Sequence, residues 1–204
     1  MASDFHTHKL TAEGRALVSA EHPVPGGLVS LEVHPWKIGA DFPGLPADFA
    51  ARLEECAALG EVGFDPLRGD AKRQLELLSE LLTLAAELNK PVVLHLVRPT
   101  AAVFGILERY PLRYLVHGFR GKAEKLAHYL ERGYFVSLGG RSLADPGVAE
   151  FLKQRGLERI GFETDADEGI IADVLDMASR ILARSDLERV TDANFDAFLH
   201  GETR

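Results

Sequence analysis

Residues 61–97, EVGFDPLRGDAKRQLELLSELLTLAAELNKPVVLHLV, contain a complete strand–helix–strand pattern. The apolar residues in the middle recur at steps of three and four: Leu75, Leu78, Leu82, Ala85 and Leu88. This spacing predicts a helix that buries one face. We expect the helix to end at Asn89 and Pro91, because asparagine can adopt a left-handed cap and proline cannot continue a helix. The flanking apolar runs are short and unbroken, as in parallel strands covered on both faces.

The same alternation extends in both directions from this segment. Apolar runs predict strands around residues 4–5 and at 28–33, 61–64, 91–97, 114–119, 134–138 and 159–163. Helical spacing predicts helices at 46–59, 71–88, 101–109, 122–131, 146–155, 170–183 and 185–199. Repeated strand–helix alternation predicts an α/β fold with right-handed crossovers. Because no linker or low-complexity segment interrupts the pattern, we expect a single domain over residues 1–204.

The composition excludes a disordered or fibrous chain. The 204 residues are 46% hydrophobic and 26% charged, which is typical of a folded globular chain. The single cysteine, Cys56, lies in a helical pattern and is interpreted as packing. With no long apolar run and no basic-then-apolar leader, we expect a cytoplasmic protein without a membrane partner. The net charge of −8 disfavours broad attraction to nucleic acid but leaves room for a local basic pocket.

Polar residues that can bind metals stand at the ends of the predicted strands. His6 and His8 alternate along the first strand and can face one point, although a histidine pair alone is a weak signal. The later strands add Glu61, His95, His117 and Asp165. Burying so many polar groups without partners would be costly, so a shared metal site explains them better than a core does. Nitrogen and oxygen donors suit one or two divalent ions such as zinc, manganese or iron, and the Glu61 carboxylate could bridge two of them.

Seven short motifs follow one another along the chain. They are Asp-Phe-His-Thr-His (4–8), Glu-Val-His-Pro-Trp (32–36), Gly-Glu-Val-Gly-Phe-Asp (60–65), Pro-Val-Val-Leu-His (91–95), Val-His-Gly-Phe-Arg-Gly (116–121), Phe-Val-Ser-Leu-Gly-Gly (135–140) and Glu-Thr-Asp-Ala (163–166). This ordered series resembles the TatD family of metal-dependent hydrolases, which are amidohydrolase-like TIM barrels. The resemblance implies a TIM-type barrel whose metal ligands are His6, His8, Glu61, His95, His117 and Asp165.

The resemblance also implies hydrolysis of phosphoester bonds, since members of the family are described as deoxyribonucleases. A divalent ion such as Zn, Mg or Mn lowers the pKa of bound water and neutralises phosphoryl charge. Asp165, beside the metal, is expected to act as general base, and Glu61 as the bridging carboxylate. The expected substrate is a small phosphoester or a DNA end, and no protein partner is predicted. The alternatives are hydrolysis of a small phosphorylated, amide or lactone metabolite, and a non-catalytic metal-binding protein.

Four residues near the predicted ligands are candidates for substrate binding. His34 matches a family position near the pocket, and Trp36 is either a stacking platform for a base or a core aromatic. Arg98 and Arg120 replace the usual family pattern just beyond two ligands, where a guanidinium can grip phosphate. The alternative for both arginines is a solvated or salt-bridged surface side chain.

The length limits how complete the barrel can be. A (β/α)₈ barrel usually needs about 250 residues, so this one is expected to be compact or incomplete. Only 26 residues separate His8 from His34, too few for two full strand–helix units. Residues 16–21 therefore form a second strand almost without a helix, or that strand is absent and seven remain. In either case the helical wall is expected to be thin over residues 9–27.

Overall fold

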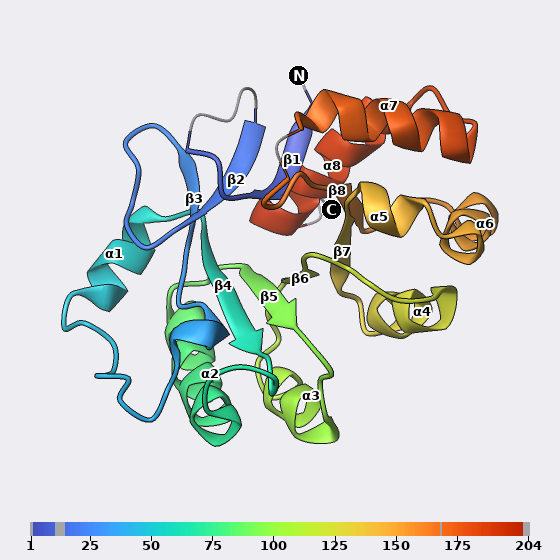
Figure 1. The fold of residues 1–204 in the computed structure, drawn as a ribbon. Helices are drawn as coiled ribbons and strands as arrows, with labels where there is room; N and C mark the ends of the chain where they lie inside the picture. Colours follow the sequence, from blue (N-terminus) through green and yellow to red (C-terminus); the bar gives the residue numbers. More distant parts are fainter. Residues whose placement is uncertain (1, 11–14, 168, 202–204) are drawn as a thin grey trace. The chain divides into compact units, whose positions relative to one another are not determined.

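The computed structural model describes residues 2–10, 15–167 and 169–201. Its strands follow the order of the chain (Figure 1): β1 Ser3–Thr7, β2 Arg15–Ala20, β3 Leu28–Leu31, β4 Ala58–Phe64, β5 Val92–Leu96, β6 Tyr114–Val116, β7 Phe135–Leu138 and β8 Ile160–Phe162. The second strand predicted at residues 16–21 is therefore present, and the alternative with seven strands is wrong.

Helices alternate with strands from β3 onward. They are the 3₁₀ turn η1 Pro35–Lys37 and the helices α1 Phe49–Glu55, α2 Ala71–Glu87, α3 Ala101–Leu107, α4 Ala123–Glu131, α5 Gly140–Leu143, α6 Pro146–Arg155, α7 Ile171–Leu182 and α8 Leu187–His200. Residues 9–10 and 15–27 contain no helix, as predicted for the thin segment, whose residues 11–14 lie outside the described part of the chain. None of the helices in the described residues is long and apolar enough to cross a membrane.

The chain divides into two compact units, and the first contains residues 1–18 and 115–204. Here β6, β7 and β8 pair in parallel, and β1 pairs with the first residues of β2. The end of β1 also meets the end of β8, because the Asp165 amide donates to the His6 carbonyl at 2.9 Å and the His8 amide donates to the Asp165 carbonyl at 3.3 Å. The two ends of the sequence are thereby joined in one unit, as the first and last strands are in a (β/α)₈ fold.

A buried aromatic cluster supports β1 in this unit. The Phe5 ring meets the Phe195 ring of α8 edge-on, with centroids 5.1 Å apart, and both side chains are fully buried. Since successive side chains of a strand point to opposite faces, anchoring Phe5 against α8 directs His6 to the other face.

The second unit contains residues 19–114, with β3, β4 and β5 paired in parallel and α2 packed against β4. The Asp70 side chain caps α2 by accepting a hydrogen bond from the Arg73 amide. The helix ends as predicted, with Asn89 in a left-handed conformation at φ 50°. Both ends of α2, the helix packed against β4, are thus defined by local contacts.

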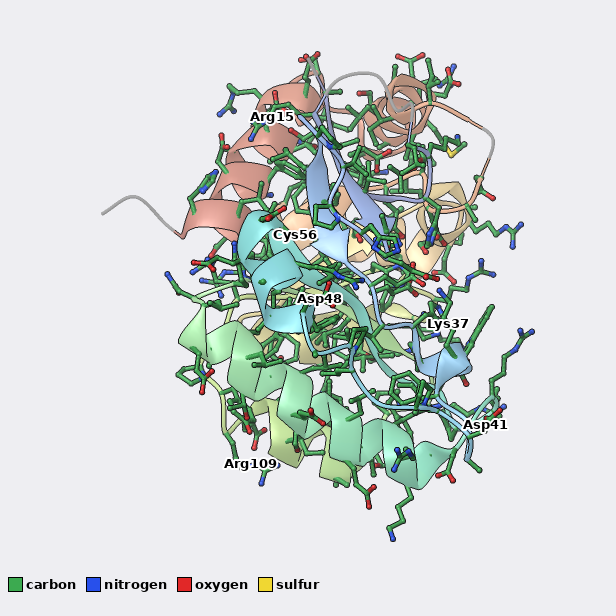
Figure 2. All side chains as sticks on the ribbon, turned by 90° about the vertical axis from the view of Figure 1, so that its left-hand side faces the viewer. Arg15, Lys37, Asp41, Asp48, Cys56 and Arg109 are labelled. Atoms are coloured by element: carbon green, nitrogen blue, oxygen red, sulfur yellow. The ribbon has the colours of Figure 1, made fainter. Side chains whose placement is uncertain are left out.

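Two local features differ from the predictions. The helix predicted over 46–59 is too long, because α1 ends at Glu55 and Ala58 already pairs with Ser30 in the sheet. Cys56 lies between them in an extended conformation, with its side chain 3% exposed, so its packing role is confirmed (Figure 2). The sequence does not predict the short helix α5, because its first residue is glycine and it is too short to show a helical period.

Candidate metal centre

The first group of candidate ligands lies in the unit of residues 1–18 and 115–204. It consists of one residue at the carboxyl end of each of three strands: His6 in β1, His117 after β6 and Asp165 after β8. One ligand atom of each residue lies within 4.8 Å of the ligand atoms of the other two. The rings of His6 and His117 have centroids 4.0 Å apart, and His6 Nε2 lies 3.8 Å from Asp165 Oδ1. Parallel strands end at the same edge, so the topology itself brings these side chains together.

His8 adds a further imidazole to this group, from a partly exposed position. Its Nε2 lies 3.6 Å from the same Asp165 Oδ1, and its ring centroid is 5.0 Å from that of His6. His6 is fully buried, whereas the His8 side chain is about one third exposed. The two alternate histidines of β1 thus approach one carboxylate oxygen, in agreement with the expectation that they face one point.

Hydrogen bonds between β1 and the residues after β8 hold this geometry. The Thr164 hydroxyl donates to Asp4 Oδ2 at 2.7 Å, and the amides of Thr164 and His6 donate to Asp4 Oδ1. Burial raises the pKa of the Asp4 carboxyl to about 6, against the opposing effect of these hydrogen bonds. The first aspartate of the Asp-Phe-His-Thr-His motif thus positions the segments that carry His6 and Asp165.

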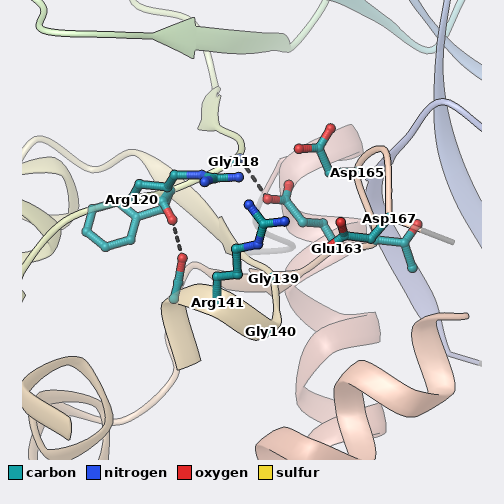
Figure 3. A pocket seen from close by; sticks show the side chains of 11 residues that line it. Gly118, Arg120, Gly139, Gly140, Arg141, Glu163, Asp165 and Asp167 are labelled. Carbon is teal, nitrogen blue, oxygen red and sulfur yellow. Dashed lines mark hydrogen bonds between the residues drawn. The ribbon is translucent and has the colours of Figure 1, made fainter. Parts of the chain in front are cut away.

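Glu163 plays a similar part next to His117. One of its oxygens accepts from the Gly118 amide at 2.7 Å (Figure 3). The other accepts from the Ser137 hydroxyl at 2.5 Å. Its complete burial raises the pKa of the carboxyl to about 7. Glu163 therefore holds the backbone directly after His117 and ties it to β7.

The second group lies in the unit of residues 19–114 and combines His34, Glu61 and His95. Glu61 Oε1 is 2.6 Å from His95 Nδ1 and 3.0 Å from His34 Nε2. Glu61 is 1% exposed, so its charge is compensated by these imidazoles rather than by water. The sequence predicts His34 as a substrate contact; its position against Glu61 makes it a candidate ligand as well.

Trp36 and Asp65 extend this group outward. The indole Nε1 of Trp36 donates to Asp65 Oδ2 at 2.6 Å, and the same oxygen lies 3.7 Å from His95 Nε2. Trp36 is 47% exposed, so the alternative of a core aromatic is wrong. The Arg68 guanidinium lies over the indole ring, 3.9 Å from its centroid. The exposed ring is thus fixed at one edge by Asp65 and covered in part by Arg68.

Gln74 on α2 is a supporting residue that the sequence does not reveal. Its fully buried amide accepts from the Asp65 amide and donates to the carbonyls of Pro35, Asp65 and Arg68. Gln74 thus ties the segments that carry Trp36 and Asp65 to a helix. Nothing in the helical period marks it, because a polar residue on a buried face is apparent only when its partners are known.

The two predicted phosphate-binding arginines follow β5 and β6. Arg98 and Arg120 lie beyond the strand ends, and among the described residues neither guanidinium forms a hydrogen bond or ion pair. The salt-bridged alternative is therefore not realised in the described part of the chain. Arg120 lines a pocket that also includes Asp165, Gly118 and Arg141 (Figure 3).

Comparison with known protein families gives one family over most of the chain. Residues 7–168 match the model of TatD related DNases. The chain is 30% identical over 138 residues to "Deoxyribonuclease Tat-D" of Schizosaccharomyces pombe, covering 59% of this chain and 44% of that protein. It is 34% identical over 124 residues to "Uncharacterized metal-dependent hydrolase YjjV" of Escherichia coli, covering 57% and 48%. The chain spans about half the length of the curated relatives it matches.

Solved structures share the fold. YjjV of Escherichia coli superimposes with a TM-score of 0.72 at 22% identity, over 91% of this chain and 86% of the other. A TatD family hydrolase of Entamoeba histolytica gives a TM-score of 0.63 at 17% identity, over 74% and 66%. The predicted fold class, an α/β barrel of the TIM type, is confirmed.

Proposed function

The chain belongs to the TatD related DNase family, and from this premise we propose that it is a divalent-metal-dependent hydrolase of phosphoester bonds. The observation that carries the proposal is the convergence of imidazole and carboxylate donors in each compact unit, at the carboxyl ends of parallel strands. Three donor atoms within 4.8 Å fit the first coordination shell of a divalent ion with nitrogen and oxygen ligands. The donor chemistry therefore supports one or two ions.

We assign the ligands as the sequence predicts them: His6, His8, Glu61, His95, His117 and Asp165. His34 is an additional candidate, since it contacts the same Glu61 oxygen as His95. With His34 and His95, the Glu61 carboxylate would hold an ion in the unit of residues 19–114. When bound, a divalent ion supplies water of lowered pKa and neutralises charge on phosphoryl oxygens.

The other steps belong to the chain's own residues. The Asp165 side chain is about one third exposed at the pocket edge, where its carboxylate can accept the proton of the attacking water as general base. Arg120, which is unpaired among the described residues, lines the pocket with Asp165 and binds a phosphoryl oxygen there. Arg98, which has no partner in the described part of the chain either, is the phosphate-binding candidate of the other unit. Glu163 and Asp4 keep the backbone that carries His117, His6 and Asp165 in place.

The proposed substrate is a DNA end. Two observations support this proposal. The fission yeast relative is named a deoxyribonuclease, and the exposed Trp36 ring offers a stacking surface for one base. The net charge of −8 agrees better with recognition of a single end than with binding along a duplex.

Turnover by the purified protein tests the proposal. The protein is assayed with Mg²⁺, Mn²⁺ and Zn²⁺ against a single-stranded oligonucleotide and against bis(p-nitrophenyl) phosphate, with EDTA as the metal-free control. We expect metal-dependent cleavage. Tight metal binding without cleavage of either substrate would contradict phosphoester hydrolysis and favour a metal-binding protein or another ester class.

A variant pair assigns the activity to the proposed site. His95→Ala removes a nitrogen that faces Glu61, so it should abolish turnover and weaken metal binding. His200→Ala changes an exposed histidine at the end of α8 and should leave both unchanged. Full activity of His95→Ala would exclude it from the metal centre.

A further inference from the structure

We propose that Arg120 and Arg141 together form a phosphate-binding subsite beside Asp165, in the pocket between the loops that follow β6 and β7. The subsite rests on the proposed function and deepens it, because it assigns a place for one phosphate group of the substrate. Arg141 directly follows the motif of residues 135–140 and has no part in the metal centre.

The topology brings the two arginines to one edge. β6 and β7 are parallel neighbours, with Val116 aligned with Val136, so the residues after both strands emerge on the same side. Arg120 stands four residues after β6, and Arg141 lies in α5, directly beyond β7. Both line the pocket with Asp165, and Figure 3 shows their guanidinium groups pointing toward the Glu163 and Asp165 side.

Neither of the two arginines is held by a carboxylate among the described residues. Among these residues, neither guanidinium has a hydrogen bond or ion pair. Other arginines of this unit do: Arg15 binds Asp196, and Arg184 binds Asp186. Two unpaired cations that line one pocket repel each other, and an anion between them removes that repulsion.

The carboxylates of the pocket do not fill this role. Both Glu163 oxygens already accept hydrogen bonds, from the Gly118 amide and the Ser137 hydroxyl. Asp165 faces His6 and His8. Asp167 also lines the pocket, and no ion pair joins it to either arginine in the described residues. The guanidinium groups therefore remain available to a ligand.

The shape and donors of the pocket favour phosphate. Gly118 and Gly139 line the pocket without side chains, and φ of +58° at Gly118 disfavours any residue with a Cβ. Guanidinium groups bind phosphate oxygens in pairs, with a geometry that lysine lacks. A phosphate held here lies next to Asp165, one of the candidate ligands.

Calorimetric titration with inorganic phosphate tests the subsite without turnover. The protein is kept metal-free in EDTA, so that the metal centre does not contribute. We expect the dissociation constant for phosphate to rise about tenfold or more in Arg141→Ala, the loss expected for one charge-assisted hydrogen bond. Arg141→Lys should recover part of this loss, and Arg120→Ala with Arg141→Ala should abolish binding.

Arg155→Ala is the matched control, because it removes an arginine of α6 that does not line the pocket. Phosphate binding should be unchanged in this variant. The proposal is overturned if wild-type protein does not bind phosphate, if the double variant binds it as well as wild type, or if Arg155→Ala weakens binding equally.

An activity measurement separates this result from the proposed function. On an oligonucleotide substrate, Arg141→Ala should raise KM by a factor similar to the loss of phosphate affinity. If the protein cleaves no phosphoester but loses phosphate binding in Arg141→Ala, the subsite stands and the hydrolase proposal fails. If cleavage occurs and the dissociation constant for phosphate is the same in wild type and in the double variant, the hydrolase proposal stands and the subsite fails.

Discussion

Gln74 illustrates how a single residue outside the candidate site can control its geometry. One buried amide hydrogen bonds with four backbone groups from the segments that carry Trp36, Asp65 and Arg68. The same segments place the Trp36 indole against Asp65 and the Asp65 carboxylate near His95. The partners are one backbone donor and three backbone acceptors, so the side chain must both accept and donate, as an amide does with its oxygen and its two N–H groups.

Replacement of this amide tests its role. Gln74→Leu leaves buried backbone donors and acceptors without partners, at about 1–3 kcal/mol for each unsatisfied group. We expect the free energy of unfolding to fall by at least about 2 kcal/mol in urea denaturation. Gln154→Ala, which removes an exposed amide bound to Glu150, is the control and should change little. Equal stability of both variants would show that water or other side chains replace the Gln74 contacts.

Trp36 is the residue through which the proposed substrate can be checked. Stacking of a base on an aromatic ring contributes about 1–3 kcal/mol, so Trp36→Ala should raise KM for a single-stranded oligonucleotide roughly tenfold. The same variant should leave KM for an oligonucleotide with an abasic end unchanged. Trp36→Phe keeps a ring but loses the hydrogen bond to Asp65, and its KM should lie between those of wild type and Trp36→Ala. An equal effect on both substrates would contradict stacking.

At the scale of elements, the paired strands β4 and β5 show how close backbone approach shapes the second ligand group. Gly63 aligns with His95 in the parallel register, and a Cβ built on Gly63 would lie 2.2 Å from the His95 carbonyl oxygen. With φ of +146°, Gly63 also occupies a region that other residues rarely adopt. Glycine is therefore required for β4 to approach the strand that carries His95.

Gly63→Ala tests this close approach. Either His95 must move or β4 must separate from β5, so we expect unfolding at lower urea concentration and weaker metal binding. Gly105→Ala on α3 is a matched control, because nothing lies within 4 Å of its added methyl group. In a helix this exchange should stabilise the protein by about 0.5–1 kcal/mol. A Gly63→Ala variant as stable as wild type would refute the need for glycine.

At the scale of the whole molecule, the proposed metal binding links stability to ligand concentration. An ion that binds only the folded chain stabilises it by mass action, by about 2.7 kcal/mol at a concentration one hundred times its Kd. We expect Zn²⁺ or Mn²⁺ to raise the thermal unfolding midpoint, EDTA to reverse the effect, and His117→Ala to reduce it. His200→Ala should respond like wild type. If added metal does not change the thermal unfolding midpoint of the wild-type protein, the proposed ion does not bind.

Much of this molecule follows from its sequence, because strand and helix periods are local properties of the chain. The alternation over residues 61–97 predicts the α/β fold, and the polar ends of the predicted strands point to one shared set of candidate ligands: His6, His8, Glu61, His95, His117 and Asp165. The ends of elements are predicted less accurately. The helix predicted over 46–59 ends at Glu55, because residues 58 and 59 pair with β3 as part of β4 and this pairing outweighs their local helical preference.

The tertiary structure alone decided which distant side chains meet. His34 contacts Glu61, Gln74 supports Trp36 and Asp65, and Arg141 joins Arg120 in one pocket. These residues lie in loops or on helix faces, where no period marks their function. Their partners are set by which strands are neighbours and by how loops pack over the carboxyl ends, and such long-range contacts have no local signature in the chain.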